Sequence, residues 1–480
     1  MTDRHVDVAI IGTGSAGMSA YRAARNHTQS LALIEGGEYG TTCARVGCMP
    51  SKLLIAAAEV NHTIHGAKTF GIDAPAPHVD GARVMERVRR ERDRFVGGVL
   101  NAVEGFAPEH RIRGYARFLD DHRLQVDDGT TLYAERIVIA TGSRPVAPRP
   151  WVEALGERLV YNDDVFDWER LPDSVAVFGG GVIGLELAQA LHRLGVRMRL
   201  FGKDGFVGPL TDPTVKAHAA ELFRQEYPFY PDGKVGDIRR QGDQVAISFT
   251  DDDGTEREEL FDYLLAATGR RASVDNLGLE HTSLPLDAQG VPIVDPLTSQ
   301  VGHSHVFIAG DATNTVPLLH EAADEGRIAG DNAGRYPDIR VRPRRAPLSV
   351  VFCDPQIALV GATHAELAAR DVPMALGDVD FAGQGRARVI DRNRGLLRVY
   401  GEHGSGRFLG AEMCAPAAEH MGHLLAWALQ QQMTVQEMID SPFYHPVIEE
   451  GVRTALRKLQ QALRMGPMPP ENCIDCGPGG

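Results

Sequence analysis

Hydrophobic residues in this chain gather in short, uninterrupted runs, and one arrangement of these runs occurs twice. Each copy consists of a β-branched apolar run, a helical segment and a second apolar run: residues 7–11, up to about residue 25, and 31–34 in the first copy, and residues 174–178, up to residue 195, and 197–201 in the second. Runs of this kind are typical of parallel strands that are buried on both faces. The pattern therefore predicts two strand–helix–strand units.

A glycine triplet joins strand to helix in both units: Gly12, Gly14 and Gly17 in the first, and Gly179, Gly181 and Gly184 in the second. In such a triplet the first glycine makes the tight turn, the second lets the backbone approach a pyrophosphate, and the third lets the helix pack on the strand. The free amides at the helix N-terminus then bind phosphate. Two triplets predict two bound dinucleotides, between which electrons can pass.

The two units differ after their second strand. Glu35 follows this strand in the first unit, where an acid accepts hydrogen bonds from ribose hydroxyls. Gly202 and then Lys203 stand at the equivalent place in the second unit. An acid there favours the 2′-hydroxyl of NAD, whereas a cation can bind the 2′-phosphate of NADP. Lys203 is therefore either a phosphate ligand or an ordinary surface lysine, and the nucleotide preference stays open.

Two Ala-Thr-Gly sequences end strands on either side of the second unit, with Thr141 and Gly142 in the first and Gly269 in the second. We expect these positions to join the second dinucleotide-binding domain to the first. A later strand, which starts at residue 306, ends in Asp311, whose carboxylate could accept a hydrogen bond from a polyol hydroxyl.

The pattern changes from about residue 344. Strands are expected at residues 347–360 and 396–413 and helices at 417–431 and 447–464, with no third glycine triplet. The sequence predicts an α/β protein with two Rossmann-like domains and a C-terminal α+β domain. The expected boundaries are 1–145 for the first part of the first domain, 146–270 for the second domain, 271–343 for a segment that returns to the first, 344–465 for the C-terminal domain and 466–480 for a flexible tail.

Cys43 and Cys48 lie five positions apart in a glycine-rich stretch. In a regular helix this spacing turns the second side chain roughly 140° away from the first. A disulfide needs Cβ atoms about 4 Å apart, so a bonded pair requires a departure from helix geometry. Gly47 and Pro50 permit that departure. The alternative is two unrelated buried thiols.

Two further groups could carry chemistry near the C-terminus. His445 lies between prolines with Glu450 nearby, and a carboxylate that orients a histidine can make it a base, although a lone histidine is more often structural. Cys473 and Cys476 form a second pair in a proline-rich tail. That tail is either inert, a redox relay or half of a zinc site, and one pair lacks the four ligands that a closed zinc site needs.

Composition narrows the class of protein. A net charge of −14 gives no support for non-specific nucleic-acid binding, and no apolar stretch of the length that a membrane span needs occurs. Six cysteines in 480 residues are too few for a secreted disulfide framework. No signal peptide is recognisable. We expect a cytoplasmic protein with no metal, nucleic-acid or membrane partner.

Together these features closely resemble the flavin-dependent pyridine nucleotide–disulfide oxidoreductases, and within them the dihydrolipoamide dehydrogenases. The resemblance covers residues 5 to about 465. Its most specific motif is the Cys43–Cys48 pair followed by Pro50, Ser51 and Lys52, and the two glycine triplets, Asp311 and His445 with Glu450 follow in the family's chain order.

The resemblance implies two cofactors. FAD is expected at the first triplet, with the binding residues Gly12, Gly14, Gly17, Glu35, Thr42, Lys52, Thr141, Gly142 and Asp311. The nicotinamide cofactor, NAD or NADP, is expected at Gly179, Gly181, Gly184, Lys203 and Gly269.

The resemblance also implies the catalytic roles. Cys43 is expected to exchange with the substrate, Cys48 to face the flavin, and Lys52 to pair with Glu186 near the flavin. His445, held by Glu450, is expected to be the acid–base, supplied by the other subunit of a homodimer.

Three departures from dihydrolipoamide dehydrogenases keep the substrate open: Gly202 in place of an acid, Tyr444 in place of a small residue, and the Cys473/Cys476 tail. The leading hypothesis is an FAD enzyme that oxidises a dihydrolipoyl group with NAD⁺, with a lipoyl-carrying protein or a small dithiol or disulfide as partner. The second is an NADPH-dependent reductase of another disulfide or of mercuric ion, with the tail as relay. The third is an inactive flavin-binding interaction subunit.

Overall fold

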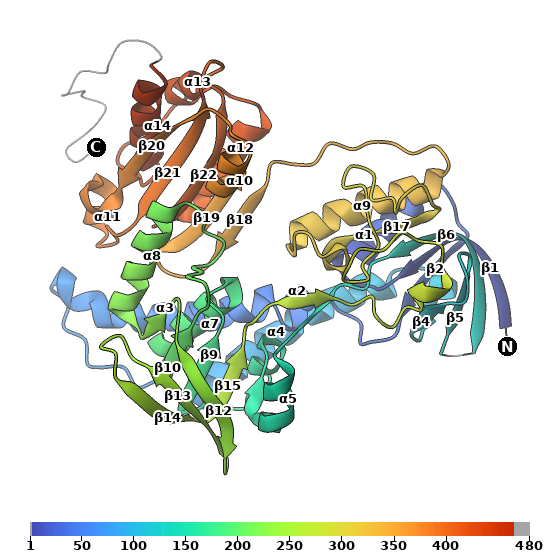
Figure 1. Ribbon diagram of the computed structural model, residues 1–480, viewed down its shortest axis with the longest axis horizontal. Helices are drawn as coiled ribbons and strands as arrows, with labels where there is room; N and C mark the ends of the chain where they lie inside the picture. The colour runs from blue at the N-terminus through green and yellow to red at the C-terminus, as the bar shows by residue number, and fades with distance from the viewer. Residues whose placement is uncertain (1, 128, 465–480) are drawn as a thin grey trace.

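A computed structural model describes residues 2–127 and 129–464, apart from the side chains of Thr2 and Asp3. The predicted tail pair, Cys473 and Cys476, lies outside the described residues. The chain forms two α/β units and a C-terminal α+β unit, which lie at three corners of the molecule in Figure 1. The predicted α/β class is confirmed.

The first unit contains a seven-stranded sheet in the order β3-β2-β1-β6-β5-β4, with β17 also paired to β6. Its strands are β1 (Thr2–Ile11), β2 (Leu31–Glu35), β3 (Arg111–Arg113), β4 (Ala116–Phe118), β5 (Arg123–Val126), β6 (Thr130–Ile139) and β17 (Val306–Ile308). Along β1, Val8 and Ile10 pack in one core cluster, while Ala9 and Ile11 pack in another on the opposite face. Both faces are therefore buried, which explains the uninterrupted apolar run.

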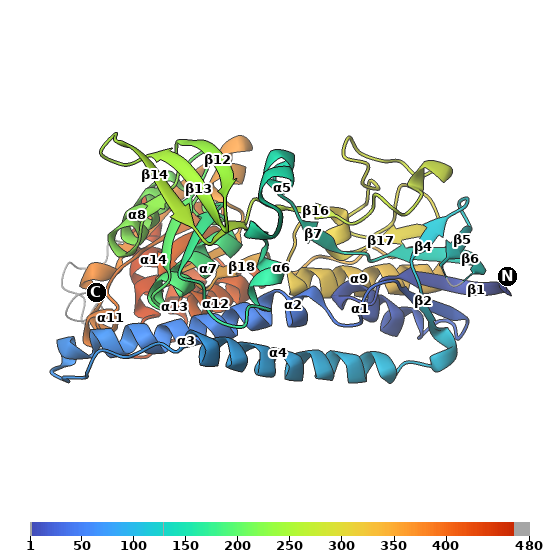
Figure 2. The same ribbon diagram turned by 90° about the horizontal axis from the view of Figure 1, so that it is seen from below.

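Helices α1 (Ser15–Ala24) and α9 (Leu319–Arg335) lie side by side on this sheet in both views (Figures 1 and 2). Their backbones approach closely because α9 presents glycines. A Cβ added at Gly326 or Gly330 would lie 2.1 Å from the carbonyl oxygen of Ala16 or Ala20. A segment from late in the chain thus covers the helix that follows the first glycine triplet.

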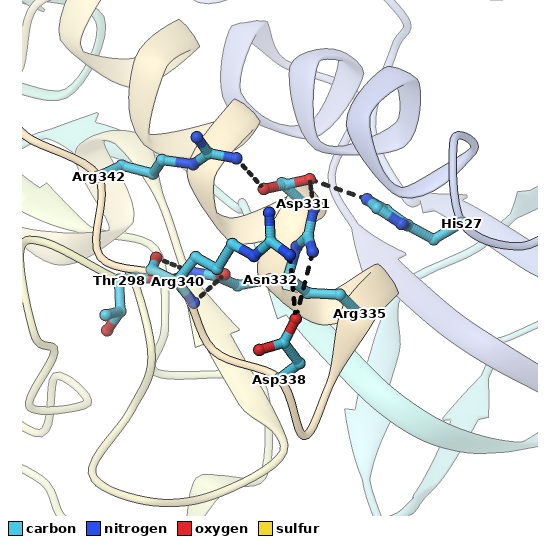
Figure 3. Close-up of polar contacts among 8 residues, drawn as sticks. All are labelled: His27, Thr298, Asp331, Asn332, Arg335, Asp338, Arg340 and Arg342. Carbon is cyan, nitrogen blue, oxygen red and sulfur yellow. Dashed lines mark hydrogen bonds and ion pairs between the residues drawn. The ribbon is translucent and has the colours of Figure 1, made fainter.

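Polar contacts also fasten this late segment (Figure 3). The carboxylate of Asp331 accepts hydrogen bonds from His27 at 2.8 Å, Arg335 at 3.1 Å and Arg342 at 2.9 Å. Although burial opposes the effect, these donors hold the pKa of Asp331 below its usual range. The neighbouring Asn332 bonds the backbone of Thr298 and Arg340, and Asp338 contacts Arg335 and Arg340.

The second unit repeats the design with a parallel sheet in the order β11-β10-β9-β15-β8. Its parallel strands are β8 (Leu159–Val160), β9 (Ser174–Phe178), β10 (Arg197–Phe201), β11 (Phe229–Tyr230) and β15 (Tyr263–Ala266). An antiparallel sheet adds β12 (Val235–Gln241), β13 (Gln244–Thr250) and β14 (Glu256–Phe261). The helices are α5 (Arg149–Leu155), α6 (Asn162–Val165), α7 (Val182–Arg193) and α8 (Pro213–Glu226). A two-stranded ribbon of β7 (Ser143–Pro145) and β16 (Arg270–Ala272) joins the two units after the Ala-Thr-Gly sequences.

Three helices between β2 and β3 of the first unit extend to the second unit. These are α2 (Thr42–Arg45), α3 (Cys48–Gly66) and α4 (Gly81–Glu104). The two long helices run side by side along one edge of the molecule in Figure 2, and α3 packs on α7 of the second unit. The cysteine stretch therefore lies where the first two units meet.

The C-terminal unit is an antiparallel sheet in the order β18-β19-β22-β21-β20. Its strands are β18 (Leu348–Val351), β19 (Gln356–Gly361), β20 (Met374–Asp380), β21 (Leu396–Glu402) and β22 (Phe408–Ala415), and its helices are α10 (His364–Ala369), α11 (Gly385–Val389), α12 (Ala418–Gln430), α13 (Val435–Asp440) and α14 (Glu450–Leu463). The fully buried Glu412 fixes this sheet to the second unit, because its carboxylate accepts from the backbone amides of Thr211 and Asp212.

Some element bounds differ from the sequence expectations. The last helix begins at Glu450 rather than at residue 447, because the Glu450 carboxylate accepts the Val447 amide at 3.2 Å and holds the preceding residues outside the helix. The strand before the first Ala-Thr-Gly sequence begins as early as Thr130. Short 3-10 helices complete the chain: Ala67–Phe70, Pro108–His110, Gly156–Arg158, Leu279–His281, Gly310–Thr313 and Phe381–Gly383. Within residues 2–127 and 129–464, none of the helices combines the length and apolar character that crossing a membrane requires.

Candidate active site

The two cysteines belong to different helices. Helix α2 ends at Arg45, Gly47 has φ −126° and ψ −115°, and α3 begins at Cys48. Pro50 lies in the first turn of α3, and its missing N–H is the one that a continuous helix would offer to the carbonyl of Val46. The expected departure from helix geometry is confirmed, and Gly47 and Pro50 both take part in it.

Cys43 and Cys48 are free thiols that lie close enough to shift each other's pKa. Donation from Cys43 lowers the pKa of the Cys48 thiol to about 7, and the Lys52 ammonium helps despite partial burial. The same hydrogen bond, together with burial, raises the pKa of Cys43 well above its usual range. The pair is therefore asymmetric, with Cys48 as the sulfur that carries negative charge near neutral pH.

Lys52 forms an ion pair across two domains. It lies one helical turn after Cys48 on α3 and contacts both carboxylate oxygens of Glu186 on α7, at 2.9 and 2.7 Å. Only 4% of the Glu186 side chain is exposed, and the carboxylate also accepts the backbone amide of Phe352 at 2.9 Å. The Lys52 ammonium lies 4.7 Å from the centre of the Phe352 ring. A buried carboxylate with these partners holds the ammonium in one place.

A cavity of about 450 Å³ joins these groups. Eight of the residues expected to act on substrate or cofactor line it: Gly14, Thr42, Cys43, Cys48, Lys52, Gly142, Glu186 and Asp311. Sequence reasoning missed other polar or aromatic residues of its wall, among them Asn162, Phe166, Arg270, Phe352 and His423. They come from segments far along the chain, and none belongs to a motif.

The first glycine triplet is shaped as a cofactor cradle. A Cβ at Gly12 would lie 2.3 Å from the carbonyl oxygen of Ala140, and one at Gly17 would lie 1.9 Å from that of Gly12. A Cβ at Gly14 would meet nothing within 4 Å, so the space above this residue is open. The hydroxyl of Thr141 is buried without a hydrogen-bond partner among the described residues. The open face and the unpaired hydroxyl fit a bound dinucleotide such as FAD.

Glu35 ends β2 beside this cradle. The strand expected to run to Asp311 ends at Ile308, and Asp311 lies in the short 3-10 helix that follows. The Glu35 carboxylate accepts from the amide and the hydroxyl of Thr13, both at 2.8 Å, so it braces the glycine turn. The Asp311 carboxylate accepts from Ser143 at 2.8 Å, and Ser143 in turn accepts from Arg270 at 2.8 Å. Both carboxylates therefore have protein donors beside the place expected for the cofactor.

The second triplet reproduces the same spacing. A Cβ at Gly179 would lie 2.2 Å from the Ala267 carbonyl oxygen, one at Gly184 would lie 1.8 Å from that of Gly179, and Gly181 is open. At the end of the following strand a Cβ at Gly202 would lie 2.6 Å from the carbonyl oxygen of Pro231. No acidic side chain can therefore stand at residue 202 without a shift of the backbone.

The remaining predicted residues of the second cradle, Lys203 and Gly269, do not line the cavity. Lys203 is exposed just after β10, and Gly269 has φ +114° in the turn before β16. Within the described ranges, no cluster of three or more histidine, cysteine, aspartate or glutamate side chains could hold a metal ion.

Two family models match this chain. The model described as pyridine nucleotide-disulphide oxidoreductase matches residues 6–326, and the dimerisation domain of the same family matches residues 348–456. The chain belongs to the pyridine nucleotide-disulphide oxidoreductases. This family uses FAD and NAD(P), and the two cradles described above fit those cofactors.

Three relatives within the pyridine nucleotide-disulphide oxidoreductases are similar over nearly the whole chain. A mercuric reductase from Streptomyces lividans is 31% identical over 92% of this chain and 93% of its own length. A dihydrolipoyl dehydrogenase from Haloferax volcanii is 30% identical over 95% and 97%, respectively. A mycothione reductase from Mycobacterium tuberculosis is 32% identical over 95% and 99%. The chain is thus an oxidoreductase of this family. The names of these three relatives refer to three different substrates.

The match to the dimerisation domain implies a homodimer. In the C-terminal unit His445 contacts Glu450 through Nδ1, at 2.9 and 3.1 Å from the two carboxylate oxygens. The His445 side chain is 63% exposed, and it does not line the cavity of its own chain. The oriented imidazole is therefore not part of the cavity wall that carries the cysteines of the same subunit.

Proposed function

We propose that this protein oxidises a dihydrolipoyl group through the Cys43–Cys48 disulfide and FAD, with NAD⁺ as the final acceptor. The observation that carries the reaction class is one cavity wall that brings Cys43 and Cys48 together with the Lys52–Glu186 ion pair. The substrate itself is assigned from the resemblance to dihydrolipoyl dehydrogenases, one of which is 30% identical over 95% of this chain.

The asymmetry of the cysteine pair favours one direction of attack. In thiol–disulfide exchange the sulfur of lower pKa leaves faster. A substrate thiolate would bond to the Cys43 sulfur and release Cys48 as a thiolate, which its low pKa and Lys52 stabilise. The second substrate thiolate would then displace Cys43, so that the substrate leaves as a disulfide and the enzyme keeps two electrons as a dithiol. FAD, when bound, accepts these electrons and passes them as hydride to the nicotinamide cofactor.

The proton of the incoming thiol needs a base. We infer that the partner subunit's His445 takes it, because this imidazole is already oriented by a carboxylate and is exposed at the surface of the dimerisation domain. Each active site would then need both subunits of the homodimer.

One observation favours a second candidate, an NADPH-dependent reductase of another disulfide or of mercuric ion. An acid that would prefer NAD has no room at Gly202, and the exposed Lys203 follows. The relatives named mercuric reductase and mycothione reductase are about as similar to this chain as the dihydrolipoyl dehydrogenase. The Cys473/Cys476 pair would then be the relay.

An anaerobic comparison of substrates and nucleotides separates the candidates. Dihydrolipoamide would be supplied with NAD⁺ or NADP⁺, and NADH or NADPH with lipoamide, mycothiol disulfide, glutathione disulfide or mercuric ion. We expect fastest turnover with dihydrolipoamide and NAD⁺. Turnover only with NADPH and a non-lipoyl acceptor would overturn the leading proposal, and its loss in Cys473→Ser/Cys476→Ser would then assign the tail as the relay.

A further inference from the structure

The segment between the two cysteines has an unmet hydrogen-bond requirement within its own helices. In a continuous helix the carbonyl of Val46 would accept from the N–H of residue 50, which is a proline. Two other carbonyls of this segment have local donors. The Thr42 carbonyl accepts a hydrogen bond from the Val46 amide at 2.9 Å, and the Gly47 carbonyl accepts one from the Ser51 amide at 3.2 Å. Among the described residues, no backbone amide donates to the Val46 carbonyl.

Asn162 supplies a donor from the second domain. Its Nδ2 lies 3.0 Å from the Val46 oxygen, across 116 positions of sequence, and the side chain is 5% exposed. The same nitrogen donates to Asp163 at 2.7 Å, which fixes the rotation of the amide. Asn162 follows β8, and β8 pairs with β15 at the edge of the second sheet. The position of the donor is thus set by the nicotinamide-binding domain.

Val46 lies between the two cysteines, next to the turn at Gly47. Val46 lines the cavity of about 450 Å³ on one side and a second cavity of about 560 Å³ on the other. The hydrogen bond from Asn162 is therefore a direct restraint from the second domain on the turn between Cys43 and Cys48.

We propose that Asn162 is a positioning residue, which acts through the Val46 carbonyl to hold the turn that sets Cys43 beside Cys48. The inference rests on the proposed use of these cysteines as the redox pair. It also implies that a shift of the nicotinamide-binding domain would move the turn between the two thiols and change their relative position. When the restraint is lost, Cys43 ceases to donate to Cys48, and Cys48 becomes a more ordinary thiol.

The test measures the thiols without any substrate. The reduced enzyme is alkylated with iodoacetamide over a range of pH, and modification at Cys48 and Cys43 is counted by mass spectrometry. Asn162→Leu keeps the volume and loses the donor, Asn162→Ala removes the side chain, and Asn162→Ser restores a shorter donor. With the donor lost, we expect the Cys48 midpoint to rise from about 7 by about one unit, which slows alkylation at pH 7 about fivefold.

A matched control comes from Asn61, whose Nδ2 donates to the Arg193 carbonyl at 2.5 Å and likewise links α3 to the second domain. We expect Asn61→Ala to lower thermal stability and to leave the Cys48 midpoint unchanged. Asn162→Ser should return the midpoint toward that of the unmodified chain. An unchanged midpoint in both Asn162→Leu and Asn162→Ala, or an equal shift in Asn61→Ala, would overturn the proposal. Because no substrate is used, a wrong substrate assignment leaves this result unaffected.

Discussion

The two dinucleotide cradles of this enzyme are built on the same three glycines, and they differ in what braces them. In the first cradle the Glu35 carboxylate holds the turn through Thr13, and a helix from late in the chain packs on α1. In the second cradle Gly180 replaces the threonine, and the amide of Gly208 bonds its carbonyl at 2.7 Å. A local loop thus holds the glycine turn in the second cradle, as the Glu35 carboxylate holds it in the first.

This difference separates two properties of the fingerprint. The glycine spacing fixes how strand, turn and helix meet, and it is nearly identical in the two cradles. The residue after the second strand determines which group on the ribose the cradle can bind, and the two cradles have different residues at this position. A fingerprint therefore predicts a dinucleotide reliably and its chemical identity much less so.

The largest expected effect comes from breaking the shared geometry. Gly17→Ala and Gly184→Ala would place a methyl group within 2 Å of a carbonyl oxygen, at 1.9 and 1.8 Å. Since neither backbone can move without opening the helix–strand contact, we expect melting temperatures to fall by about 5 °C or more, measured by circular dichroism.

The second glycines provide the control. Gly14→Ala and Gly181→Ala add a methyl group to open space. We expect both variants to keep the fold, while Gly14→Ala loses FAD affinity and Gly181→Ala loses nicotinamide affinity. Equal melting temperatures for all four variants would contradict the division between packing glycines and cofactor-facing glycines.

Sequence reasoning succeeded where a function is carried by spacing within a short segment. The two glycine triplets and the turn at Gly47 obey local rules of this kind, whereas the late strand expected to run to Asp311 ends at Ile308. It failed for Asn162 and Phe352, because a single hydrogen bond or ring contact across more than a hundred residues leaves no local pattern. The role of Gly202 needed coordinates too, since only they show the Pro231 carbonyl that excludes a side chain.

The next test introduces into the second cradle an acid like Glu35 of the first. Gly202→Glu would place its Cβ 2.6 Å from the Pro231 carbonyl oxygen. We therefore expect a melting temperature a few degrees lower, by about 2–5 °C, and no gain in preference for NADH over NADPH. A stable variant with a strong new preference for NADH would show that the loop yields easily and that the two cradles are interchangeable.

The dependence of the first cradle on a distant segment predicts a pH effect. The pKa of Asp331 is lowered by its three donors, so its contribution to stability is complete above the unfolded pKa of about 3.9 and is lost as pH falls through the folded pKa. We expect Asp331→Asn to destabilise the fold by about 1–3 kcal/mol at pH 7. The difference in melting temperature from the unmodified chain should shrink as the pH is lowered below 4. A difference that stays constant down to pH 3 would contradict the charge-assisted role.

The smallest expected effect concerns Lys203, which could give the second cradle a phosphate contact at the end of β10. It is exposed, so a bond to a 2′-phosphate would be screened by solvent and contribute about 1 kcal/mol. Lys203→Glu should therefore raise KM for NADPH about fivefold and leave KM for NADH nearly unchanged. Lys68→Glu, an exposed lysine in the turn after α3, makes the same change in net charge away from the cradle and should change neither. An equal change in KM for NADPH and NADH in Lys203→Glu would mean that this lysine acts through the overall surface charge and not through a contact with the 2′-phosphate. Any preference between the two nucleotides would then come from the backbone of the loop.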